Sequence, residues 1–198
     1  MALTHDASLT EIELSGLSLT DQHAKGVTLN TVKLDGCDLS GSRLEYLRII
    51  DGELSSCNLA NLQAHGATFA SVVIERSRLT GIDLAEATLK DVTVRDCRID
   101  LASFRGSRLE RVTFADCVLT QTDFLEARLD SVRFHGCDLV NADLRGARLR
   151  TCELRRNDLT GLQGVESLRG AAMEWPDIVN MAGVWAAALG IEVLDSEG

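Results

Sequence analysis

The sequence predicts a solenoid, a chain wound into stacked coils that turns a corner every five residues. Between Ala102 and Leu149 every fifth residue is Phe or Leu, and a smaller residue stands two positions before each of them. Neither a helix, with a period of about 3.6 residues, nor a strand, with a period of two, places such a repeat on one face. A fixed short period is typical of solenoids, whose coils bury their inner residues on one another.

The five-residue register continues over most of the chain without insertion or deletion. Steps of five from Leu9 to Leu159 meet Leu, Ile, Val or Phe everywhere except at Ala24 and Ala64. At Ala64 the residue two positions earlier is Leu62, so large and small inward residues exchange places on that side. We therefore expect one solenoid domain over residues 9–162, preceded by a short lead-in over residues 1–8.

The repeat resembles the pentapeptide-repeat family, whose consensus is A(D/N)Lxx. The units that carry the resemblance start at Cys57, Cys137 and Ala142 and read CNLAN, CDLVN and ADLRG. The resemblance implies an all-β fold, a right-handed quadrilateral parallel β-helix with four five-residue sides and therefore twenty residues per coil. Residues 7–162 then make nearly eight coils, and at about 4.8 Å per coil the rod is about 38 Å long.

A coil of twenty residues predicts that residues twenty apart stack in columns. Five of the six cysteines obey this rule, with Ser77 in the one gap: Cys37, Cys57, Cys97, Cys117 and Cys137. The phenylalanines pair in the same way, Phe104 with Phe124 and Phe114 with Phe134. We expect both sets to form ladders inside the coil.

The sequence predicts no catalytic, metal or cofactor site. All six cysteines occupy the small inward position, where Cys acts as a small apolar residue, and none forms the close pairs of structural zinc sites. The four histidines form no cluster. An enzyme needs a pocket with convergent polar groups, and a rod filled with Leu, Phe and Ala offers none, so we expect a protein that is not an enzyme.

The third segment, residues 163–198, contains a predicted helix in EWPDIVNMAGVWAAALG. Pro176 suits the first turn, Asp177 suits the positive N-terminal end, and Gly190 is a plausible stop. Because the open end of a solenoid needs a cover, we expect this helix to cap the last coil.

This helix is apolar nearly all round, which is typical of helices that are buried on both sides. A monomer offers only one side, so we expect a homodimer through the C-terminal end, with residues 191–194 adding a strand to the contact. The predicted interface comprises Trp175, Ile178, Val179, Met181, Ala182, Val184, Trp185 and Leu189.

The same segment resembles the Qnr and MfpA quinolone-resistance proteins, through AAALGIEV after an LRGA turn. No loop interrupts the coil, which fits the MfpA-like members better. The resemblance implies a homodimer that mimics B-form DNA and binds DNA gyrase or topoisomerase IV, without binding nucleic acid directly.

The charge pattern leaves two functions open. Acids favour two adjacent sides of the coil, while a third side is basic and lacks the interleaved aromatics of nucleic-acid sites. The candidate partner-facing stripe comprises Asp83, Glu86, Asp100, Asp123, Glu126, Asp138, Asp143 and Asp158. The net charge of −10 is less than half of the roughly 22 charges of duplex DNA over this length. The alternative is therefore a scaffold with an unrelated partner, whose acids only keep the rod soluble.

The sequence predicts no membrane segment, because no stretch approaches the roughly 20 apolar residues of a spanning helix. The N-terminus, MALTHDASL, lacks the basic-then-apolar layout of a signal peptide. We therefore expect a cytoplasmic protein.

Overall fold

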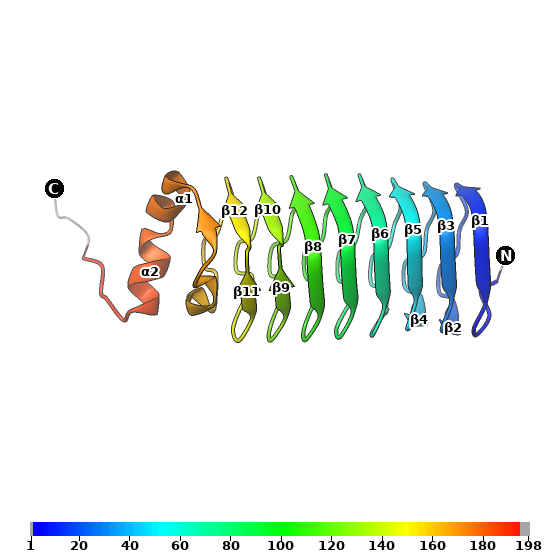
Figure 1. Ribbon diagram of the computed structural model, residues 1–198, viewed down its shortest axis with the longest axis horizontal. Helices are drawn as coiled ribbons and strands as arrows, with labels where there is room; N and C mark the ends of the chain where they lie inside the picture. Colours follow the sequence, from blue (N-terminus) through cyan, green and yellow to red (C-terminus); the bar gives the residue numbers. More distant parts are fainter. Residues whose placement is uncertain (1, 195–198) are drawn as a thin grey trace.

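The computed structural model describes residues 2–194 and consists mainly of a rod of parallel strands stacked side by side (Figure 1). The longer sheet runs β1-β3-β5-β6-β7-β8-β10-β12-β13, with β9 and β11 joined to it, and a second sheet pairs β2 with β4. The strands are β1 (Ser8–Ser15), β2 (His23–Lys25), β3 (Thr28–Asp35), β4 (Arg43–Glu45), β5 (Arg48–Ser55), β6 (Thr68–Glu75), β7 (Thr88–Arg95), β8 (Arg108–Ala115), β9 (Arg128–Asp130), β10 (Arg133–His135), β11 (Arg148–Arg150), β12 (Glu153–Arg155) and β13 (Ala172–Met173). The predicted fold class is confirmed, because these strands form a parallel β-solenoid of about eight turns.

The backbone turns a corner at every fifth residue. From Asp6 to Gly161 each fifth residue has a positive φ, including Thr31 at 53° and Leu101 at 60°. This left-handed conformation costs an L-residue roughly 1–2 kcal/mol, so stacking must hold it in place. The N–H of Leu101, for example, donates to the carbonyl of Thr120 one coil further on, at 3.0 Å. Four such corners close a coil, and strand partners from β1 to β11 lie twenty residues apart.

The interior contains buried cysteines and stacked phenylalanine rings. All six cysteines are free and buried, and the rings of Phe104 and Phe124 stack with centroids 5.0 Å apart. Phe114 and Phe134 stack at 5.2 Å, and edge-to-face contacts join the two stacks. Each coil therefore adds one layer of side chains to a single continuous core.

The first coil begins earlier than the predicted boundary at Leu9. Leu3 is buried, and its N–H donates to the side-chain oxygen of Gln22 at 3.0 Å. The N–H of Asp6 donates to the carbonyl of Lys25 at 2.8 Å. Residues 3–7 of the predicted lead-in therefore already stack on the next coil, while Met1 lies outside the described residues.

The C-terminal end is closed by short elements rather than by the single predicted helix. They are the 3-10 helix η1 (Val165–Leu168), β13, α1 (Trp175–Asn180) and α2 (Ala182–Ala188). The helix is broken at Met181, whose side chain is 2% exposed and packs into the core. Asp177 is also buried, and its carboxylate accepts the N–H of Arg156 at 2.9 Å. The break thus lets two side chains reach the last coil.

Neither helix in the described part of the chain has the length and apolarity needed to cross a bilayer. Residues 195–198, the end of the predicted C-terminal segment, lie outside the described residues.

Candidate functional site

The candidate acids lie on two adjacent sides of the rod that meet at one corner, and at the next corner. Asp123 and Asp143 are register neighbours, as are Asp138 and Asp158, and the two columns flank the same corner. We call these four residues the acidic edge. Asp83 and Asp100 continue it toward the N-terminus, while Glu86 and Glu126 stand at the next corner, with φ of 57° and 59°.

The aspartates of the acidic edge also hold the backbone. In each of them Oδ1 accepts the N–H of the residue two positions ahead, at 2.7–3.0 Å. Asp83 makes the same bond at 2.9 Å, and Asn58 makes it with an amide oxygen at 3.2 Å. Such a side-chain bond mimics a backbone turn, so these residues shape the strand end before the corner.

Two of the candidate acids are neutralised by neighbouring arginines. Arg145 contacts Asp143 at 2.6 Å, and these hydrogen bonds hold the pKa of Asp143 below its usual range. Burial alone raises the pKa of Asp100, but hydrogen bonds from Thr80 and Arg98 outweigh it, and the net shift is downward. Both carboxylates therefore stay ionised, yet they contribute little net charge to the surface.

Five of the six remaining candidate carboxylates carry uncompensated charge. Among residues 2–194, no ion pair involves Asp83, Asp123, Asp138, Asp158 or Glu126, whereas Glu86 lies 3.5 Å from His65. Exposed pairs of this kind contribute about 0–1 kcal/mol. The acidic edge is thus negative because of Asp123, Asp138 and Asp158.

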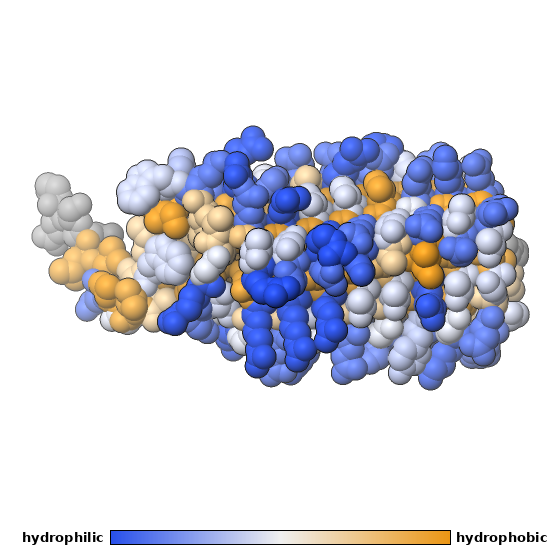
Figure 2. Space-filling view, in the orientation of Figure 1, coloured by the Kyte–Doolittle hydropathy of each residue, from blue (hydrophilic) through white to orange (hydrophobic). Residues whose placement is uncertain are grey.

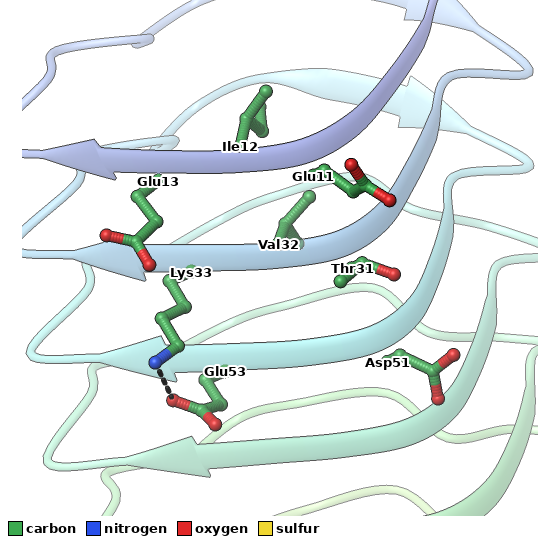
Figure 3. Close-up of a pocket in the computed structure, with 8 residues that line it drawn as sticks. All are labelled: Glu11, Ile12, Glu13, Thr31, Val32, Lys33, Asp51 and Glu53. Atoms are coloured by element: carbon green, nitrogen blue, oxygen red, sulfur yellow. Dashed lines mark ion pairs between the residues drawn. The ribbon is translucent and has the colours of Figure 1, made fainter.

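A shallow groove near the N-terminus shows how charges stack elsewhere. It has a volume of about 280 Å³, and Glu13, Lys33 and Glu53 follow one another on β1, β3 and β5 along one side of it (Figure 3). Lys33 contacts Glu53 at 3.5 Å. Across the described residues, no three His, Cys, Asp or Glu side chains come together as a metal site. One side of the groove is therefore a column of alternating negative and positive charges on the surface of the sheet.

The C-terminal end exposes an apolar patch. Figure 2 shows hydrophobic side chains gathered beyond the last coil. Of the predicted interface, Met181 is buried within the chain, Ile178, Val184 and Trp185 are partly buried, and the outermost residues are Trp175, Val179, Ala182 and Leu189. Trp175 is 76% exposed and Leu189 is 74% exposed. Met181 therefore belongs to the cap and not to an outward face.

The repeat geometry agrees with a match to a known family. Residues 87–163, which include the acidic edge, match the family model described as a pentapeptide repeat region. Over these residues the chain has a pentapeptide repeat region. The recurring side-chain bond of Asp or Asn explains the second position of the A(D/N)Lxx unit in this rod, because either side chain supplies the accepting oxygen.

Several solved structures are similar to this chain. HetL, involved in heterocyst differentiation regulation in the cyanobacterium Nostoc sp. strain PCC 7120, is 22% identical, with 85% of this chain and 90% of that chain covered and a TM-score of 0.37. A trypsin-treated QnrB1, a plasmid-mediated fluoroquinolone resistance protein, is 16% identical, with 96% and 99% covered and a TM-score of 0.39. No curated protein matches.

The backbone role of the aspartates was not part of the sequence interpretation. It assigned the aspartates of the acidic edge to partner binding or to solubility, although the family consensus contains a signal of the backbone role. A position that accepts Asp or Asn requires an oxygen and not a charge. An Asp→Asn variant therefore removes the charge and keeps the side-chain oxygen that accepts the backbone N–H.

The bond at Asp143 leads to a testable prediction. We expect Asp143→Ala to lower the free energy of unfolding by about 1–2 kcal/mol and Asp143→Asn to lower it by less than about 1 kcal/mol. Because the pKa of Asp143 is lower in the folded protein than in the unfolded chain, its charge stabilises the fold above the unfolded pKa and loses this effect as the pH falls through the folded pKa.

Urea denaturation between neutral pH and about pH 3 measures both effects. The Asn variant should lose less stability on acidification than the native protein does. Equal unfolding free energies for the Ala and Asn variants at neutral pH would contradict the role of the side-chain bond.

Proposed function

We propose that this chain is a non-catalytic interaction protein whose acidic edge docks on the basic DNA-binding surface of a type II topoisomerase, DNA gyrase or topoisomerase IV, in place of duplex DNA. The observation that supports this function is the run of uncompensated carboxylates, Asp123, Asp138 and Asp158, along one straight edge of the rod. The topoisomerase comes from the sequence resemblance to quinolone-resistance pentapeptide-repeat proteins. Such a partner also requires the predicted cytoplasmic location.

The local charge density supports mimicry better than the net charge does. The acidic edge places two aspartates in each of its two coils, which is one carboxylate per about 2.4 Å of rod at the usual strand spacing. Duplex DNA carries one charge per roughly 1.7 Å. With Asp143 neutralised by Arg145, the edge reaches about half of the density of DNA over two coils.

A homodimer through the C-terminal end is part of this proposal. The exposed apolar residues Trp175, Val179 and Leu189 continue into Ile191 and Leu194, which are 56% and 80% exposed. Contiguous apolar patches of this kind mark interaction sites. A second copy would cover them and place a second acidic edge beyond the first, which lengthens the negative surface.

Sedimentation of the native protein and a Trp175→Glu variant tests the dimer. We expect a dimer for the native protein and a folded monomer for the variant, because Trp175 is exposed in the single chain. A native protein that sediments as a monomer at micromolar concentration would exclude this part of the proposal.

A supercoiling assay with DNA gyrase, with and without a fluoroquinolone, tests the partner. We expect the native protein to inhibit gyrase or protect it from the drug, and the variant with Asn at residues 123, 138, 143 and 158 to lose this effect while it stays folded. The control replaces the four acids at Glu11, Glu13, Asp51 and Glu53 around the groove of Figure 3 with their amides. Loss in both variants would indicate nonspecific charge, and no native effect would exclude gyrase.

The second candidate function is a scaffold with an unrelated partner. The ion pairs Asp143–Arg145 and Asp100–Arg98 favour it, because they reduce the charge that a DNA mimic would present. A native protein that leaves both gyrase and topoisomerase IV unaffected would support this candidate.

A further inference from the structure

Three arginines form an unpaired column on a different side of the rod from the acidic edge. Arg108 on β8 pairs in register with Arg128 on β9, which pairs with Arg148 on β11. All three are exposed. Within residues 2–194 none of them forms an ion pair or a side-chain hydrogen bond, whereas the neighbouring Arg150 is held by Asp130.

The three positively charged arginines of this column repel one another. Like charges directly opposite each other on paired strands are destabilising. The two preceding coils carry Thr68 and Thr88 in the same column, and Thr is favoured in strands. The fold therefore does not require arginine here, and a bound anion would relieve the repulsion.

The surroundings form a shallow, positively charged groove of about 430 Å³. Figure 2 shows a row of strongly hydrophilic side chains over the lower parts of β8, β9 and β11. Two acids also line the groove, but Glu110 is bound by Arg111 and Asp130 by Arg150. The three unpaired guanidinium groups thus remain available to an external ligand.

We propose that Arg108, Arg128 and Arg148 dock an acidic α-helix of a partner protein, with carboxylates on one helix face at intervals of three or four residues. Guanidinium groups bind carboxylates through two parallel hydrogen bonds. The site goes beyond the proposed function, because it uses neither the acidic edge nor a topoisomerase.

Spacing favours a helix over other acidic ligands. The column rises by about 4.8 Å per coil, and a helix rises by about 5.4 Å per turn, so three contacts accumulate a mismatch of only about 1 Å. Same-face residues of an extended strand lie about 6.7 Å apart, and the mismatch grows to about 4 Å. Nucleic acid would extend beyond the column and meet a chain of net charge −10.

Fluorescence anisotropy with synthetic peptides tests the site. The probe is a labelled alanine-based helix with glutamates at i, i+4, i+7 and i+11, and the control peptide has the same composition with the glutamates spread around the helix. At low ionic strength we expect the aligned peptide to bind the native protein about tenfold more tightly than the spread one, and added salt to weaken it.

Matched variants locate the binding. Replacing all three arginines by Thr, the residue of the preceding coils, should abolish the preference for the aligned peptide without lowering the melting temperature. Replacing Arg78, Arg95 and Arg133 by Thr removes three positive charges from other sides of the rod. This control should keep the preference for the aligned peptide. Replacing the column by Glu should create binding to the lysine version of the aligned peptide.

Four outcomes would overturn the proposal. They are equal binding of the two peptides, unchanged binding by the Thr variant of the column, tighter column-dependent binding of single-stranded DNA, and column-dependent self-association of the protein.

Discussion

Replacement of Phe124 by Ala is expected to lower the free energy of unfolding by about 3–5 kcal/mol. The Phe124 ring is fully buried, stacks on Phe104 at 5.0 Å and meets the edge of Phe134 at 5.9 Å. Its removal leaves a cavity between two coils that the flat strands cannot close. Urea denaturation followed by circular dichroism measures the loss.

Phe124→Leu is the matched control, because Leu84 and Leu144 occupy the same column on either side of the two phenylalanines. We expect it to cost about 1 kcal/mol. The double variant with Phe104→Leu should cost less than the sum of its single variants, since the stacking partner is then also gone. A loss below about 1 kcal/mol for Phe124→Ala would show that the stack does not stabilise the rod.

Gly164→Ala is expected to destabilise the C-terminal end by about 2–5 kcal/mol, from a left-handed conformation combined with overpacking. Gly164 has a φ of 76°, and a Cβ there would lie 2.6 Å from the Cα of Arg145 and 2.6 Å from the carbonyl carbon of Leu144. Backbone atoms cannot move aside, so η1 would lift off the last coil. Hydrogen exchange should then accelerate in β11 and β12 before it does in the middle of the rod.

Gly170→Ala separates the two causes. Gly170 has a φ of 83°, but no atom lies within 4 Å of the added Cβ. We expect a cost of about 1–2 kcal/mol, from the conformation alone. Equal effects at Gly164 and Gly170 would mean that the close approach to Arg145 does not matter.

The repeat made the solenoid predictable, because one rule recurs in every coil. The inward columns of Phe104 and Cys117 follow from the spacing of the sequence. In the structure Phe104 stacks on Phe124, and all six cysteines are buried. A local error in the register would have placed charged residues inside, so the absence of any break left few alternatives.

The features that could not be predicted from the sequence depend on contacts that occur once and do not recur in every coil. Met181 interrupts the helix because its side chain fills the end of the rod, and a helical apolar pattern does not reveal that depth. The pairing of Asp100 with Arg98 and of Asp143 with Arg145 depends on side-chain conformation. A count of charges by side therefore overestimated the negative surface. Trp175 is exposed in the single chain, while its role in a dimer stays a prediction.

Because a left-handed corner occurs at every fifth residue, the rod can change its length only by whole coils of twenty residues. A single inserted residue would turn the following inward side chains outward, whereas a duplicated block of twenty, such as residues 102–121, would repeat all four corners and lengthen the rod by about 4.8 Å. The permitted lengths form a series of equal steps, and each step carries its own outward residues. Duplication of whole twenty-residue coils would thus lengthen the rod and repeat the same pattern of outward residues at regular intervals along its surface.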